Sequence, residues 1–225
     1  MFRTAGILLL FSMFASKATT FDLSRDFSFQ SGPNQVWKYG YSLTNSLDPS
    51  QFRADEYADP SAPIGFWHPS ASQGPGPGWY PYVAYNSSKK SQLGSSNGWS
   101  ARPGEVTMEG SNSGQYSLVR FTAPVGGTYK ITARFEGVHF GLSTTDVHVL
   151  HNGDSLFAAD IDGYGGDPAL HAIKGSNPTA SYSVEVKLDA NDTITFAVGY
   201  GKNKTNYGDT TGVFAHLELV SKARE

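Results

Sequence analysis

The sequence contains no cysteine among its 225 residues. This absence excludes a disulfide framework, a thiol nucleophile and any zinc site built on cysteine ligands. The six histidines show none of the spacings typical of zinc sites, so we do not expect zinc to be bound through histidine either. The fold must therefore be held together by packing alone.

Charge is also scarce, because only 16% of the residues are charged and the formal net charge is −3. Proteins that bind nucleic acid or anionic membranes carry an excess of lysine and arginine. We therefore expect neither partner. Aromatic residues, by contrast, reach 13%, which supplies enough apolar area for a core and argues against disorder.

Long hydrophobic runs are absent after the N-terminus. Arg3 precedes one short apolar run, residues 5–15, and the small residues Ser16 and Ala18 follow it. This pattern predicts a secretory signal peptide over residues 1–18, too short for a bilayer span of about 20 apolar residues. We expect a secreted, extracytoplasmic protein with no transmembrane anchor after cleavage; the alternative is a buried N-terminal helix.

Strand-like alternation fills the second part of the chain, residues 111–221. Apolar residues occupy every second position in four segments: Tyr129–Phe135, Tyr182–Leu188, Ile194–Val198 and Ala215–Leu219. Successive side chains of a strand point to opposite faces, so each segment has one dry and one wet face. Short strands separated by turn formers predict an all-β fold, an antiparallel β-sandwich.

The first part of the mature chain, residues 19–110, has a different texture. It holds all four tryptophans and the Pro/Gly-rich stretch 73–82, whose prolines and glycines exclude a central strand. We expect long ordered loops on the same sandwich, so that residues 19–225 form one domain. Early strands are predicted at Asp26–Phe29, Gln35–Tyr41 and Tyr82–Tyr85.

Several segments resemble known β-sandwich proteins. One is the segment 118–137, which contains the turn Ala-Pro-Val-Gly-Gly-Thr-Tyr; the others are residues 146–153, 186–199 and 209–212. Together they are similar to the central strands of jelly-roll carbohydrate-binding modules. The opening 32–40, Gly-Pro-Asn-Gln-Val-Trp-Lys-Tyr-Gly, resembles that of exported, largely uncharacterised bacterial proteins of the PEP-CTERM-associated type, although Gln35 replaces their glycine and residues 221–225 contain no apolar anchor. The resemblance implies a jelly-roll-like sandwich outside the cytoplasm and supplies no catalytic residue.

The aromatic loops suggest a ligand. Trp67, Trp79, Tyr80 and Trp99 lie among Gly, Pro, Ser and Asn. Flat sugar faces stack on indole and phenol rings, so these four side chains are candidate glycan-binding platforms. The alternative is that they bury the loops against the sandwich, because tryptophan is usually largely buried.

One acidic loop suggests a metal. Asp160, Asp162 and Asp167 stand at the first, third and eighth positions of a glycine-containing segment. Calcium takes six to eight oxygen ligands, often from such a loop. The segment lacks the EF-hand ligands at positions five and twelve, Tyr164 and His171 standing there instead. A Ca²⁺ site and a solvated acidic turn are both compatible with it.

The segment Gly153-Asp154-Ser155-Leu156 matches the nucleophile block of a class of serine esterases, but it follows Asn152 at a hairpin position. An Asn-Gly pair suits a two-residue hairpin turn, and no base lies at the required spacing. We therefore assign no catalytic residue.

The leading hypothesis is a secreted, non-catalytic protein that binds a polysaccharide or glycan. Two alternatives stay open: an extracellular structural or adhesive protein without a ligand, and a glycan-acting hydrolase that uses loop carboxylates. Three Asn-X-Ser/Thr sequons, at Asn86, Asn191 and Asn203, leave glycosylation as a further question.

Overall fold

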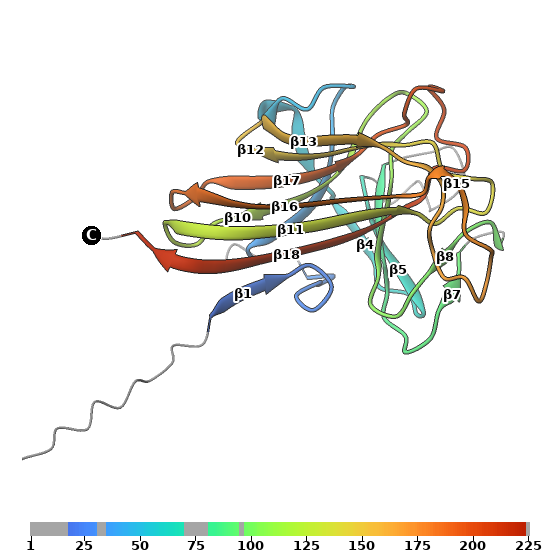
Figure 1. Ribbon diagram of the computed structural model, residues 1–225, viewed down its shortest axis with the longest axis horizontal. Coiled ribbons are helices and arrows are strands. Elements are labelled where there is room, and N and C mark those ends of the chain that lie inside the picture. Colours follow the sequence, from blue (N-terminus) through green and yellow to red (C-terminus); the bar gives the residue numbers. More distant parts are fainter. Residues whose placement is uncertain (1–17, 31–34, 70–80, 95–96, 224–225) are drawn as a thin grey trace, which may run out of the picture.

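The computed structural model describes residues 18–30, 35–69, 81–94 and 97–223. Strands account for nearly all of its regular structure, and every strand pair is antiparallel. The predicted all-β sandwich is confirmed (Figure 1). No helix in the described ranges is long and apolar enough to cross a membrane.

An eight-stranded sheet forms one layer, in the order β16-β11-β18-β9-β6-β5-β4, with β1 paired beside β18. Its strands are β1 (Thr19–Asp22), β4 (Tyr57–Asp59), β5 (Ile64–His68), β6 (Tyr82–Asn86), β9 (Val106–Glu109), β11 (Gly127–Gly137), β16 (Thr179–Leu188) and β18 (Thr211–Lys222).

A six-stranded sheet forms the other layer, in the order β13-β12-β17-β10-β2-β3. Its strands are β2 (Trp37–Ser42), β3 (Phe52–Ala54), β10 (Ser117–Thr122), β12 (Asp146–His151), β13 (Asp154–Asp160) and β17 (Thr193–Val198). A 3₁₀ turn, η1 (Pro49–Gln51), precedes β3. Two small ribbons complete the fold: β7 (Gln92–Leu93) with β8 (Ser100–Ala101), and β14 (Asp162–Tyr164) with β15 (Lys174–Asn177).

The core lies between the two sheets and follows the predicted alternation. On β11, Tyr129, Ile131 and Phe135 are fully buried, whereas Lys130 and Thr132 between them are exposed. The four alternating segments form β11, β16, β17 and β18. The hairpin prediction is also confirmed, since Asn152 and Gly153 connect β12 to β13 with φ values of 50° and 97°.

The first part of the chain contributes strands to both sheets: β2 and β3 to the six-stranded sheet, and β4, β5, β6 and β9 to the eight-stranded one. The predictions near residues 35–41 and 82–85 correspond to β2 and β6. The predicted strand Asp26–Phe29 is wrong. Asp26 closes a turn instead, because its backbone amide donates to the Asp22 carbonyl at 2.8 Å and its carboxylate accepts from the Asp22 amide.

Candidate functional site

A polar pocket lies at the end of the sandwich where β13 finishes and β12 begins. Its volume is about 490 Å³, within the range of ligand sites. The pocket collects residues from four separate places in the chain: Thr144 and Thr145, Asp160 to Asp162, Ser176 and Asn177, and Lys202 and Asn203. We call this the polar pocket.

Strand geometry directs the two acidic side chains of the polar pocket. Asp160 ends β13 and Asp162 begins β14, while Ile161 between them is buried in the core. Positions two apart in extended backbone share a face, so anchoring Ile161 inward turns both carboxylates outward. Both are exposed at the pocket.

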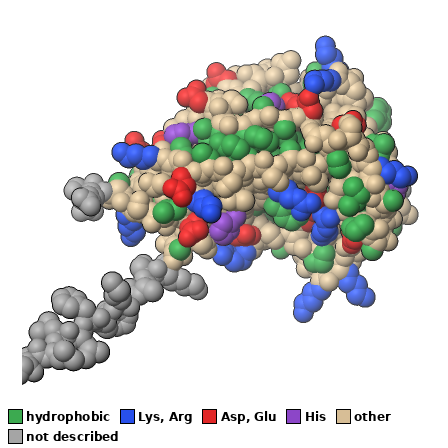
Figure 2. Space-filling view, viewed as in Figure 1, with side chains coloured by type: hydrophobic (Ala, Val, Ile, Leu, Met, Phe, Trp, Pro, Cys, Tyr) green, Lys and Arg blue, Asp and Glu red, His purple; other side chains and the backbone are tan. Residues whose placement is uncertain are grey.

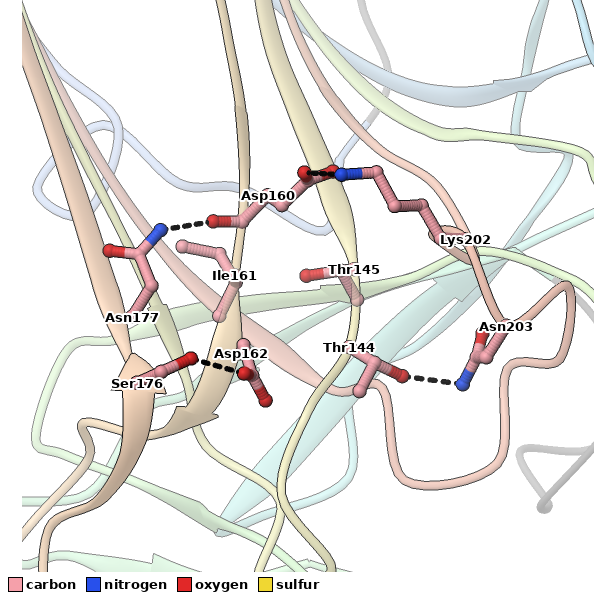
Figure 3. A pocket seen from close by; sticks show the side chains of 9 residues that line it. All are labelled: Thr144, Thr145, Asp160, Ile161, Asp162, Ser176, Asn177, Lys202 and Asn203. Atoms are coloured by element: carbon pink, nitrogen blue, oxygen red, sulfur yellow. Dashed lines mark hydrogen bonds and ion pairs between the residues drawn. The ribbon is translucent and has the colours of Figure 1, made fainter.

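Four interactions frame the opening (Figure 3). The Lys202 ammonium pairs with the Asp160 carboxylate, and the Asn177 amide donates to the Asp160 carbonyl. The Ser176 hydroxyl donates to Asp162, and the Asn203 amide donates to the Thr144 hydroxyl. Figure 3 shows these pairs around a central space rather than packed against one another. The pocket therefore presents a cation, two carboxylates and amide groups to one volume.

Two carboxylates behind the pocket, the buried Asp209 and the half-buried Asp146, hold its loops in place. Asp209 is fully buried and accepts from the Thr144 amide at 2.8 Å and from its hydroxyl at 3.0 Å. Burial raises the pKa of Asp209 to about 6. Asp146 accepts from the Gly201 amide at 2.8 Å, which fixes the start of the loop that carries Lys202.

Neither of the two predicted aromatic platforms that lie within the described residues is exposed. Trp67 and Trp99 are only 6% and 4% exposed. The Trp67 indole stacks against Tyr39, with ring centroids 5.9 Å apart, and donates to the Ser28 carbonyl at 2.9 Å. Both side chains bury the loops against the sandwich, which corrects the platform hypothesis for them. Trp79 and Tyr80 lie outside the described residues.

The three predicted calcium ligands do not converge. Asp160 and Asp162 line the polar pocket, but Asp167 accepts from the Ser91 hydroxyl and from the Ala169 amide at 2.9 Å. The described ranges contain no group of three or more His, Asp or Glu side chains placed to hold a metal ion. The glycines after Asp162 carry the chain away into the β14–β15 ribbon, so the spacing in sequence does not become a ligand set.

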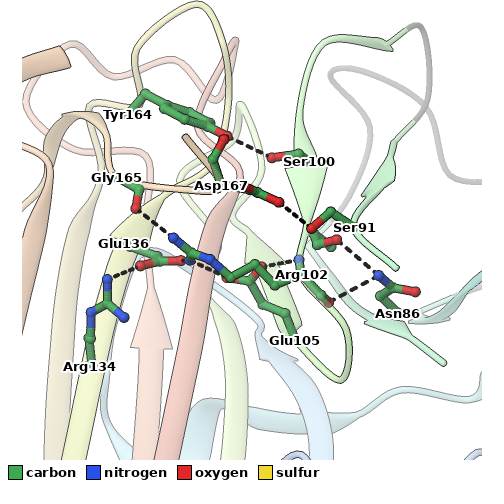
Figure 4. Close-up of polar contacts among 11 residues, drawn as sticks. Asn86, Ser91, Ser100, Arg102, Glu105, Arg134, Glu136, Tyr164, Gly165 and Asp167 are labelled. Atoms are coloured by element: carbon green, nitrogen blue, oxygen red, sulfur yellow. Dashed lines mark hydrogen bonds and ion pairs between the residues drawn. The ribbon is translucent and has the colours of Figure 1, made fainter. Parts of the chain in front are cut away.

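A second acidic group lies in the interior at the same end of the sandwich (Figure 4). Glu136 is fully buried and pairs with both Arg102 and Arg134; Glu105 is 1% exposed and accepts from the Arg102 backbone amide at 2.6 Å. Burial raises the pKa of Glu105 to about 7. We call these four residues the buried ion cluster after its two carboxylates; the Arg102 and Arg134 side chains reach the surface and are 28% and 44% exposed. A glycan cannot reach carboxylates without exposed surface, so the cluster is no hydrolytic pair.

A further buried carboxylate, Glu109, is held by neutral partners. It accepts from the Thr210 hydroxyl at 2.7 Å, from the Tyr82 hydroxyl at 3.0 Å and from the Asn206 amide at 3.3 Å. Burial raises its pKa to about 7. Glu109 therefore ties loops together and offers no acid or base to a ligand.

Most of the pocket residues were missed by sequence analysis. Asp160 and Asp162 were singled out as metal ligands, but Thr144, Ser176 and Lys202 carry no motif. Their convergence depends on β12, β15 and the β17–β18 loop meeting at one end, which only the strand order establishes. A weak signal was present, because polar residues follow the strand ends in all these segments.

The sequence matches no protein-family model and no curated protein. The resemblance to PEP-CTERM-associated proteins therefore has no support from these comparisons. Several solved structures are similar to parts of this chain at low identity. The CBM51 module from Clostridium perfringens GH95, in complex with methyl-galactose, is 10% identical with a TM-score of 0.38, covering 88% of this chain and 99% of that one.

Other solved structures match over a smaller part of this chain. A family 35 carbohydrate-binding module from Clostridium thermocellum is 12% identical with a TM-score of 0.32, covering 56% of this chain and 85% of that one. Pika GITRL is 16% identical with a TM-score of 0.28, covering 47% and 76%. Likeness at these identities and TM-scores assigns no ligand and no site residue to this chain.

Proposed function

We propose that this protein binds carbohydrate without catalysis and that the polar pocket receives the ligand. One observation carries the proposal: donor and acceptor side chains from four chain segments converge on an open volume of about 490 Å³. Sugar hydroxyls donate and accept hydrogen bonds at once. Carboxylates, amides and an ammonium group, which together supply both functions, are suited to them.

The distribution of shifted pKa values supports binding rather than catalysis. General acids and bases need a perturbed pKa and access to the substrate. Here the carboxyls whose pKa burial raises to 6 or 7, Glu105, Glu109 and Asp209, are all buried away from the surface. The exposed acids of the pocket are paired with Lys202 and Ser176 instead.

A glycan screen by isothermal titration calorimetry tests the proposal. We expect one class of oligosaccharide to bind, and Asp162→Ala and Asn203→Ala each to weaken it by about tenfold, as expected when one or two hydrogen bonds are lost. Asp154→Ala is the matched control, because Asp154 is exposed at the opposite end of β13. If Asp162→Ala and Asn203→Ala both bind the glycan as tightly as the control does, the ligand binds elsewhere. If the wild-type protein binds no glycan, the proposed function is rejected.

An assay for reducing sugar on the same glycans distinguishes binding from hydrolysis. Release of reducing sugar from a bound glycan, lost in Asp160→Asn or Asp162→Asn, would show that the exposed carboxylates act on the ligand. A protein that binds no glycan but assembles with itself would favour the structural or adhesive alternative.

Calcium stays part of the proposal in a reduced form. Two carboxylates, Asp160 and Asp162, face the pocket, whereas calcium takes six to eight oxygen ligands. An ion there would take the remaining ligands from water or from sugar hydroxyls. A rise in melting temperature with Ca²⁺ that Asp162→Ala abolishes would support the ion, and no rise would dismiss it.

We also propose that the protein acts outside the cytoplasm. The support is the predicted signal peptide over residues 1–18, of which all but residue 18 lie outside the described ranges. N-terminal sequencing of the exported protein tests this, with Thr19 as the expected first residue. A cytosolic protein that retains Met1 would contradict it.

A further inference from the structure

The two sheets leave one side of the sandwich open. β16 is the last strand of the eight-stranded sheet and, among the described residues, pairs with β11 alone; β13 is the last strand of the six-stranded sheet and pairs with β12 alone. The β16–β11 register runs from Leu188 to Thr179 without a shift. A long edge strand without a bulge leaves backbone groups available for pairing with another strand.

Apolar side chains line the gap between these two edges. They pack against the core but are only partly buried: Leu156, Phe157, Ala159, Ala180, Tyr182, Val184 and Val186. The rings of Phe157 and Tyr182 stack across the gap, with centroids 5.0 Å apart. Figure 2 shows hydrophobic side chains gathered in a strip over this part of the molecule. Such a continuous strip marks an interaction surface more often than isolated apolar residues do.

The charges on the outer face of the eight-stranded sheet indicate which partner fits. Glu218 on β18 stands opposite Lys130 on β11, and Lys130 stands opposite Glu185 on β16. The row alternates in sign and ends on an acid at the free edge. Because opposite charges stabilise cross-strand neighbours, the next strand should present a base opposite Glu185.

A second copy of this chain supplies that base. Lys187 lies two positions after Glu185 on the same face of the same strand. If two β16 strands pair antiparallel about a two-fold axis at Val186, Glu185 of each copy faces Lys187 of the other. We propose that this protein forms a symmetric dimer through the β16 edge, in this register, with the apolar strip extending across the interface.

The register is selective. Moving the axis by one residue, to Glu185, would place the two Glu185 side chains opposite each other, and moving it to Val184 would leave both charges opposite serines. Only the Val186 register gives two reciprocal ion pairs. Unlike an unrelated extended peptide, a second copy explains why acid and base are both present on one short edge.

Sedimentation velocity across a wide concentration series tests the dimer. Lys187→Glu and Glu185→Lys each turn the two attractive pairs across the interface into repulsive ones and should weaken dimerisation by about tenfold or more. Glu185→Lys also places a second lysine opposite Lys130 within the sheet, whereas Lys187 stands opposite the uncharged Thr128. The double variant Glu185→Lys/Lys187→Glu restores opposite charges in the same register and should recover the wild-type dissociation constant. Lys90→Glu, which makes the same charge change at an exposed loop position, is the control and should leave the dimer intact.

Three outcomes would overturn the proposal: a protein that is monomeric throughout the series, a dimer that the single variants do not weaken, or single variants that weaken it without recovery in the double variant. Melting temperatures of all variants identify any that fail to fold. If one single variant fails to fold, the other single variant and the double variant still test the proposal. Glycan binding to the polar pocket is measured separately, so the two proposals succeed or fail independently.

Discussion

The buried ion cluster and the polar pocket both pair a carboxylate with a cation at one end of the sandwich, yet they differ in access to water. Glu136 is fully buried between Arg102 and Arg134, whereas the Asp160 and Lys202 side chains are 49% and 85% exposed. Charges removed from water need their partners, whereas exposed pairs are stabilised by solvent with or without contact. A carboxylate and a cation therefore serve the fold in one place and remain accessible to a ligand in the other.

The sharpest test of this contrast is Arg102→Ala. The variant leaves Glu105 and Glu136 buried with one fewer cation and removes the bond from the Arg102 guanidinium to the Gly165 carbonyl. Breaking a buried pair typically costs about 3–5 kcal/mol, so we expect a loss of that size in the free energy of unfolding. Chemical denaturation measures it. A loss near zero would mean that water reaches the cluster.

The pH dependence of stability extends the comparison to carboxyls without a cation. Burial raises the pKa of Glu109 to about 7 from an ordinary 4.5. The folded protein then binds a proton that the unfolded chain releases, so the stabilisation is complete below about pH 4.5 and is lost as the pH rises through about 7. The free energy of unfolding should fall by up to about 3 kcal/mol over this window from Glu109 alone.

Glu109→Gln checks the assignment, because an amide keeps hydrogen-bonding capacity without ionising. The variant should lose the share of the decline between about pH 4.5 and 7 that Glu109 causes. The shares of Glu105 and Asp209, whose pKa values burial also raises, should remain. Parallel stability profiles for the variant and the wild type would show that Glu109 ionises normally.

Two asparagines offer a smaller, matched test. The Asn86 amide is buried and donates to the carbonyls of Lys90, Ala101 and Arg102 at 2.8, 2.9 and 3.0 Å. Asn86→Ala removes all three hydrogen bonds, although the Lys90 and Arg102 carbonyls keep their bonds from the Ser88 hydroxyl and the Glu105 amide, and should cost about 2 kcal/mol by denaturant unfolding. Asn203→Ala, at the exposed pocket, should cost less than about 0.5 kcal/mol. Equal losses would contradict the division between structural and ligand-accessible groups.

The same burial bears on the sequons. An amide nitrogen engaged by three carbonyls in the interior is not accessible for glycan attachment in the folded protein, so Asn86 is a structural residue. Asn191 and Asn203 are exposed, and their glycosylation stays a prediction to be tested by mass spectrometry.

Local patterns predicted the sheets well because alternation is a property of one strand at a time. Tyr129 to Phe135 could be assigned an inner and an outer face from period two alone. The burial of Trp67 could not be predicted in this way, because it depends on contacts with Tyr39 and Ser28, which come from other segments. The spacing of Asp160 and Asp162 indicated a shared face, but Thr144 and Asn203 meet there across 59 residues of sequence. A site formed between loops needs the strand order before it can be recognised.

The smallest expected effect concerns the exposed ion pair itself. Lys202→Ala removes the ammonium that pairs with Asp160, and the hydrogen bond to Asp160 raises the pKa of Lys202. Because both groups are well solvated, their contact contributes little to folding, and we expect no measurable change in the free energy of unfolding. Glycan affinity should nevertheless fall, since the pocket loses its only cation among the lining residues. A variant that unfolds more easily but binds glycan normally would reverse the roles argued here: Lys202 would belong to the fold, and the polar pocket would lose its strongest donor.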